Sequence, residues 1–194
     1  GRHKIELDHT NPVGDEWKYF KIQAKQGKAW ILSADKQTQN SHQELTLDKG
    51  NDTETLFVPI ADTTITGRFT GEVSPGIHAL DPTSGDRKWY TPSLADCEGK
   101  SPVPICDQGM SAAITSTDGL VFAGSLDGNL NVYDSVSGEI IWSFDTFGDF
   151  ESVSGDMALG GSIESDGPVL YEGHVLVNSG YQFGARMPGN ALMV

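Results

Sequence analysis

The sequence has few basic residues and no long apolar run. Thirteen Lys and Arg stand against 27 Asp and Glu, giving a formal net charge of −14 over 194 residues. A phosphate backbone is bound mainly by clustered Lys and Arg, so we expect no nucleic-acid partner. No stretch approaches the roughly 18 to 20 consecutive apolar residues that a membrane-spanning helix needs. We therefore expect no membrane span. The acidic residues are expected to serve mainly solubility; a Ca²⁺ site, or attraction of a basic partner, is the alternative role.

Short motifs of several common enzyme classes are also missing. His42 begins a His-Gln-Glu-Leu stretch that lacks the second His of a zinc-protease helix. Neither a Gly-x-Ser-x-Gly elbow nor a Gly-Lys-Thr phosphate loop occurs. These absences exclude the simplest hydrolase and nucleotide-binding interpretations.

What the sequence does contain favours short strands and turns. Its 23 glycines and 9 prolines indicate many turns, and its length is sufficient for one compact unit. Short apolar stretches bounded by Gly, Asp or Ser predict strands at Thr55–Ala61, Ser111–Thr115, Gly119–Gly124, Pro168–Tyr171 and His174–Asn178. Residues 91–109 and 145–162 are expected to be long connections. The predicted fold class is all-β.

An internal repeat is the most informative feature. The stretch Gly76–Trp89 matches Gly128–Trp142 in an Asp-x-x-x-Gly-x-x-x-Trp core, with 53 residues between the two Asp positions. Each copy predicts a hairpin, because Asp bonds the backbone that follows it and Gly supplies a positive φ. A weaker third copy begins near Ala29–Gln39. A spacing of about 50 residues is typical of four-stranded propeller blades. The two repeat tryptophans, Trp89 and Trp142, are expected to pack between blades.

Two cysteines, Cys97 and Cys106, lie close together in a Gly- and Pro-containing loop. Such a pair suits a disulfide in an oxidising compartment. Two free thiols, or half of a metal site, are the alternatives.

The order of these motifs resembles a known family. The series Thr55–Asp62, Gly76–Trp89 and Ser111–Trp142 is similar to the repeats of pyrroloquinoline-quinone (PQQ) dehydrogenases. Further segments resemble the polyvinyl-alcohol dehydrogenase type; they are the loop between the cysteines, Gly160–Ile163, Val177–Gly184 and Met187–Asn190. The resemblance extends over about 55–194 and is weak over 1–50.

The resemblance implies an eight-bladed β-propeller of four-stranded antiparallel blades. About four blades would fall within this chain, which we expect to be one partial propeller domain over 1–194, with both ends cut. It also implies PQQ and Ca²⁺ near the propeller axis, an alcohol as substrate and cytochrome c as electron acceptor. The expected location is periplasmic or secreted. Open blades should contact the rest of the propeller or a second copy.

The resemblance implies four candidates for contact with the quinone, namely Lys25, Asp127, Asn178 and Tyr181. Each also has an ordinary explanation. Lys25 could be a surface lysine, Asp127 could shape its turn, and Asn178 and Tyr181 could bond within their loop. Catalytic and Ca²⁺-binding residues are expected mainly in blades that precede this sequence, so none is assigned here.

One departure from the family favours a different function. The Asn-Trp pair that many of these dehydrogenases carry before the Leu-Phe-Val-Pro strand is absent from Leu47–Leu56. The alternative is therefore a non-catalytic propeller that binds proteins or carbohydrates as a scaffold, because a fold does not fix a function.

Overall fold

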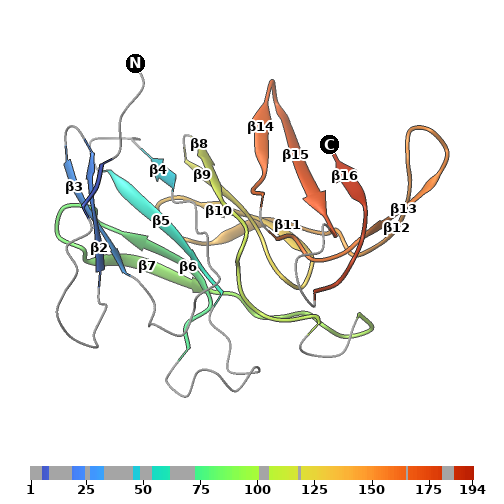
Figure 1. Cartoon of the computed structure of the whole chain (residues 1–194), viewed down its shortest axis with the longest axis horizontal. Coiled ribbons are helices and arrows are strands. Elements are labelled where there is room, and N and C mark those ends of the chain that lie inside the picture. The colour runs from blue at the N-terminus through green and yellow to red at the C-terminus, as the bar shows by residue number, and fades with distance from the viewer. Residues whose placement is uncertain are drawn as a thin grey trace.

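The computed structural model describes most of the chain from residue 54 onward, and four earlier strands by their backbone alone. The described ranges are 6–8, 19–24, 27–32, 46–48, 54–61, 73–100, 105–117, 119–164, 166–180 and 186–194. All regular elements within these ranges are β-strands (Figure 1). The all-β prediction is confirmed.

The strands form antiparallel sheets in which sequence neighbours pair. The first sheet has the order β1 (Glu6–Asp8), β2 (Tyr19–Ala24), β3 (Gly27–Leu32). The second has the order β4 (Thr46–Asp48), β5 (Thr55–Ile60), β6 (Gly76–Leu80), β7 (Arg87–Pro92). The next has the order β8 (Thr115–Thr117), β9 (Leu120–Gly124), β10 (Asn129–Asp134), β11 (Ile140–Asp145). These two four-stranded meanders are the predicted propeller blades.

Two smaller sheets follow. One is the hairpin β12 (Gly148–Glu151) and β13 (Met157–Gly160). The other has the order β14 (Val169–Tyr171), β15 (His174–Ser179), β16 (Ala191–Met193). The predicted long connection at 145–162 is therefore wrong, because that stretch contains the β12–β13 hairpin. The strand expected at Ser111–Thr115 begins later, at Thr115.

The repeat hairpins form as the sequence predicts. Oδ1 of Asp81 and Oδ1 of Asp134 each accept backbone N–H groups from the residues two and three positions ahead, at 2.7–3.0 Å. Each turn closes on a glycine of positive φ, 81° at Gly85 and 76° at Gly138. The turn N–H groups stabilise the ionised carboxylates and hold the pKa of both Asp side chains below the usual value.

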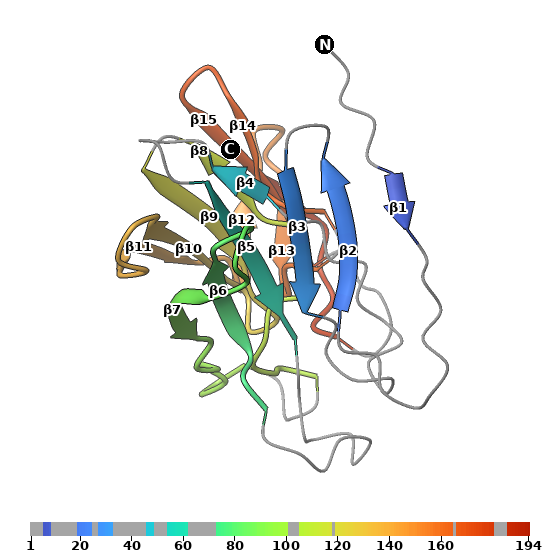
Figure 2. The same cartoon turned by 90° about the vertical axis from the view of Figure 1, so that its left-hand side faces the viewer.

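The main core lies between the β4–β7 and β8–β11 sheets, which are adjacent in both views (Figures 1 and 2). It consists of apolar side chains from both sheets and from the segment that joins them: Phe57, Ile77, Ala79, Met110, Ile114, Val121, Ala123 and Tyr133. Trp89 of β7 packs against this cluster, as predicted for a residue between blades. Trp142, its counterpart in β11, is 50% exposed.

The third repeat copy is only partly described. Strand β3 covers its first half, and the turn expected at Asp35–Gln39 lies outside the described residues. The number of blades stays a prediction.

Candidate functional site

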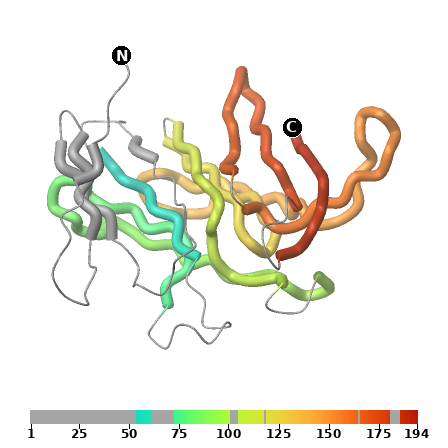
Figure 3. The backbone as a smooth tube through the Cα atoms, viewed as in Figure 1, coloured from blue at the N-terminus to red at the C-terminus, as the bar shows by residue number. Residues whose placement is uncertain are grey.

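Four segments that are distant in sequence meet at one end of the sheets, and we call them the loop cluster. They are the described parts of the disulfide loop 93–110, the turn 125–129, the segment 160–164 and the described parts of 179–189. Figure 3 follows the chain from β7 through the disulfide loop into the β8–β11 sheet. Long loops on a rigid β scaffold are where binding residues usually lie.

Hydrogen bonds connect these segments in series. The Leu126 N–H donates to the Gly109 carbonyl at 3.0 Å, and the Ser162 hydroxyl donates to the Leu126 carbonyl at 2.6 Å. The Ser162 hydroxyl in turn accepts the Met187 N–H at 3.2 Å. Because these groups are buried, their hydrogen bonds fix each segment relative to the others.

A glycine pair allows this close approach. A Cβ atom on Gly161 would collide with the backbone carbonyl oxygens of Met187 and Pro188, and one on Gly160 would collide with the Thr146 carbonyl oxygen. Only residues without a side chain fit there. This contact explains the Gly-Gly-Ser-Ile segment that carried part of the family resemblance.

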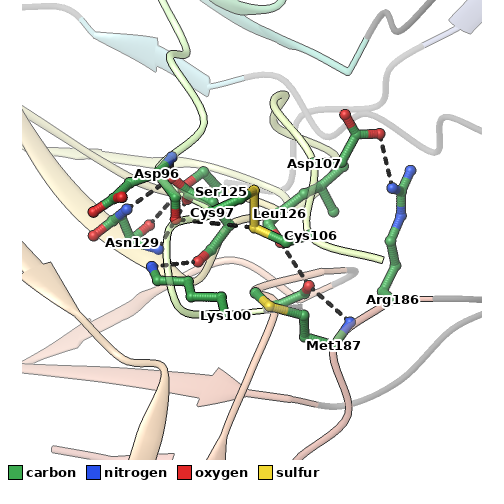
Figure 4. Close-up of a disulfide and its surroundings, with 12 residues drawn as sticks. Asp96, Cys97, Lys100, Cys106, Asp107, Ser125, Leu126, Asn129, Arg186 and Met187 are labelled. Carbon is green, nitrogen blue, oxygen red and sulfur yellow. Dashed lines mark hydrogen bonds and ion pairs between the residues drawn. A yellow bond between two sulfur atoms is a disulfide. The ribbon is translucent and has the colours of Figure 1, made fainter. Parts of the chain in front are cut away.

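The predicted disulfide between Cys97 and Cys106 is confirmed, with the two Cα atoms 5.8 Å apart (Figure 4). Neither cysteine is free, so the thiol and metal-ligand alternatives are excluded. Cys106 is fully buried. The bridge closes a short loop and holds its two ends against the turn 125–129.

Asp127 lies at the centre of that turn and is 2% exposed. Its Oδ1 accepts the Ser125 hydroxyl and the Asn129 N–H, and its Oδ2 accepts the Asn129 side-chain amide at 2.8 Å and the Asp96 N–H at 2.9 Å. An ionised carboxylate offers about four acceptor sites. These four hydrogen bonds shape the turn and connect it to the disulfide loop. Contact of Asp127 with a cofactor stays a prediction.

Two cations complete the cluster, one with a buried side chain and one partly buried, and neither is predicted from the sequence. The Lys100 side chain is 4% exposed, and its Nζ donates to the Asp127 carbonyl at 2.8 Å and to Asp145 Oδ1 at 3.0 Å. Arg186 Nη1 donates to Asp107 Oδ2 at 2.9 Å. Because Lys100 lies inside the disulfide loop, its place in the cluster could have been predicted. Nothing in the sequence near Arg186 indicates that its side chain lies in the cluster.

The structure locates two of the four predicted quinone contacts. Asp127 is buried in its turn, and Asn178 is exposed on β15, opposite Leu192 of β16. Lys25 and Tyr181 lie outside the described residues. No contact joins Asn178 to Asp127 in the described part of the chain, so the structure does not bring these candidates together.

The exposed amide of Asn178 fits a quinone, because it can donate to a carbonyl or carboxylate oxygen and accept from an N–H. Across the described ranges, no three His, Cys, Asp or Glu side chains are grouped as metal ligands. The same ranges hold no helix of the length and apolar character that crossing a membrane requires.

Comparison with known proteins gives one family and several relatives. The PQQ_2 family model, described as outer membrane protein assembly factor BamB, matches residues 74–187. The polyvinylalcohol dehydrogenase of a Pseudomonas species is 33% identical over 67% of this chain and 20% of its own length. That of Sphingopyxis sp. (strain 113P3) is 36% identical over 55% of this chain and 16% of its own length.

A third relative is the 1-butanol dehydrogenase (cytochrome c) of Thauera butanivorans, which is 32% identical over 57% of this chain. This chain covers 15% of that relative's length. The sequence thus spans a fifth or less of these three relatives. The resemblance to dehydrogenases of the polyvinyl-alcohol type is confirmed.

Proposed function

We propose that this chain, which belongs to the PQQ_2 family because the family model matches more than half of it, forms part of a PQQ-dependent alcohol dehydrogenase. One observation carries the proposal: two polyvinylalcohol dehydrogenases are 33% and 36% identical to it over 67% and 55% of the chain. The polyvinylalcohol dehydrogenases that it resembles supply the proposed substrate class, an alcohol.

The electron acceptor and the ion are finer parts of the same proposal. A relative named for cytochrome c supports a cytochrome as acceptor, with a quinone as the other choice. Ca²⁺ is proposed as the companion of PQQ from the family resemblance alone. When bound, PQQ supplies the two-electron oxidation of the alcohol, and the protein binds and orients it.

The described residues contribute a rigid frame to this proposed site. In the loop cluster, the Gly180 N–H at the end of β15 donates to the Ser162 carbonyl, and the Ile163 N–H donates to the Ser125 carbonyl of the turn that contains Asp127. The strand that carries Asn178 is thus fixed relative to this turn. Asn178 would hydrogen-bond the quinone, whereas Lys25 and Tyr181 are proposed contacts from the family resemblance. The other blades of the propeller, or a second copy of this chain, would complete the site.

An extracytoplasmic location, periplasmic or secreted, belongs to the proposal. Its support is the disulfide between Cys97 and Cys106, since such bonds persist mainly in oxidising compartments.

A second candidate is a non-catalytic propeller that binds proteins or carbohydrates. The description of the family model as an assembly factor favours it, and so does the absence of the Asn-Trp pair before β5. The four acceptor sites of Asp127 are also already used within the fold. In this case the loop cluster would be purely structural.

Titration of the full-length parent protein with PQQ separates the two candidates. Absorption and calorimetry, with Ca²⁺ present, should show saturable binding, and the absorption of bound PQQ should bleach when alcohol is added. No saturable binding would reject the dehydrogenase and leave the scaffold. Asn178→Asp is a useful variant, because a carboxylate repels the carboxylates of PQQ and should weaken binding.

A further inference from the structure

The guanidinium of Arg186 connects three segments of the loop cluster, and Figure 4 shows its pair with Asp107. It pairs with Asp107 Oδ2 at 2.9 Å and with Glu164 Oε1 at 3.9 Å. The Asp107 side chain is fully buried, Glu164 is 11% exposed and Arg186 is 20% exposed. Because Asp107 directly follows Cys106, the disulfide loop determines where the carboxylate lies.

An ion pair between a fully buried carboxylate and a partly buried guanidinium adds little net stability, because both charges lose much of their water. Its geometry is nevertheless restrictive, since either charge left alone is costly. The Asp107–Arg186 pair is therefore better explained by the position that it enforces than by the free energy that it contributes to folding.

The position that it enforces is that of the described ends of the connection between β15 and β16, residues 180 and 186–189. At one end, the Gly180 N–H donates to the Ser162 carbonyl at 2.9 Å, and at the other end Ser162 and Met187 exchange two hydrogen bonds. The Gly189 N–H donates to the Gly180 carbonyl at 2.6 Å and brings the two ends together. Arg186 directly precedes Met187, so its ion pair fixes this end of the connection to the disulfide loop.

We propose that Asp107, held in place by the Cys97–Cys106 disulfide, is a positioning residue that acts through Arg186. It sets residues 178–180 and 186–189, the described ends of the connection between β15 and β16. The proposal rests on the proposed quinone site, because Asn178 lies at one of these ends. It assigns to the disulfide a role beyond closing its own loop. Breaking the disulfide should have the same effect as removing the Asp107 charge.

The test uses the full-length parent protein and two readouts. Asp107→Asn, and the pair Cys97→Ser with Cys106→Ser, should each weaken PQQ binding at least about tenfold, as expected when two coupled sites are separated. Both should also speed hydrogen exchange at the amides of Met187 and Gly189 in the cofactor-free protein. Arg186→Lys, which keeps the charge, should restore part of both properties relative to Arg186→Met.

Asp145→Asn is the matched control, since it removes the charge from the other ion pair of the same loop. It should leave PQQ affinity within about twofold of wild type. Wild-type exchange at Met187 and Gly189 in Asp107→Asn would overturn the positioning role, as would wild-type PQQ affinity. If the unmodified protein binds no PQQ, the proposed function fails, and the exchange measurement still decides whether Asp107 orders this end of the connection.

Discussion

Trp89 donates its indole N–H to the backbone carbonyl of Ser135, 3.0 Å away in the neighbouring sheet. The Thr91 hydroxyl donates to the Gly138 carbonyl in the same turn, at 2.6 Å. The turn of the second repeat hairpin thus accepts hydrogen bonds from β7, the last strand of the first blade. The same Asp-x-x-x-Gly turn that reverses the chain within one blade also joins it to the preceding blade.

The two repeat tryptophans should therefore differ in their effect on stability. Trp89→Phe keeps an aromatic ring but leaves the Ser135 carbonyl without its donor, which should cost about 1–3 kcal/mol of unfolding free energy. Trp142→Phe is the matched control, because Trp142 is half exposed; its effect should stay within about 0.5 kcal/mol. Urea denaturation followed by circular dichroism measures both. Equal losses would show that Trp89 does not join the blades.

The two turn glycines give a second comparison. A Cβ on Gly138 would lie 2.5 Å from Trp89 Cε3. A Cβ on Gly85 would have no atom of the described residues within 4 Å. Both residues have positive φ. Gly85→Ala should cost about 1 kcal/mol for backbone strain alone, and Gly138→Ala should cost at least about 1 kcal/mol more, because the indole must move. Thermal unfolding of the two variants tests this, and a larger loss in Gly85→Ala would contradict it.

Acid should weaken the fold partly through the repeat turns. Backbone N–H groups lower the folded-state pKa of Asp81 and Asp134 below the usual 3.8. The unfolded chain therefore binds these protons more tightly. The stability contributed by the two carboxylates is complete above pH 3.8 and is lost as the pH falls through the folded-state values.

Changing both residues to Asn keeps a side-chain oxygen for the turn and removes the titration. The melting temperature of the Asp81→Asn, Asp134→Asn double variant should depend less on pH below about pH 4 than that of wild type. Asp149→Asn, at an exposed aspartate of β12, is the control for the loss of one charge. An unchanged pH profile in the double variant would show that the turns do not contribute to acid unfolding.

The sequence was sufficient to predict the hairpins because their determinants are local. Asp81 and Gly85, like Asp134 and Gly138, act through their own turns, and the nearby cysteines could be paired from spacing and composition alone. The β12–β13 hairpin was missed because its strands, Gly148–Glu151 and Met157–Gly160, alternate weakly in the sequence and bury only one of their eight residues.

The loop cluster could be predicted only in part, because its contacts join distant residues. Arg186 and Asp107 are 79 positions apart, and the Ser162 hydroxyl reaches the Leu126 carbonyl over 36. Neither partner carries a local pattern that indicates burial. The family resemblance identified the Gly160–Ile163 segment as important, but its reason, close backbone approach to Met187, required the structure.

Strand β11 gives the last prediction, because it is the edge of its sheet and all six of its residues are exposed. Trp142 stacks on Phe144 with ring centroids 6.0 Å apart, and Phe144 lies 6.3 Å from Phe150. An exposed aromatic row beside an open strand favours association with another blade or a second copy. In analytical ultracentrifugation, this chain alone should form oligomers whose proportion rises with protein concentration.

Phe144→Lys should shift that equilibrium toward monomer, because it places a charge in the centre of the row. Val153→Lys is the control: it introduces the same charge at a fully exposed apolar residue in the β12–β13 turn, away from the row. A chain that stays monomeric at every concentration would contradict the prediction. Equal dissociation by both lysines would assign the effect to net charge, since each substitution moves the chain from −14 toward neutrality.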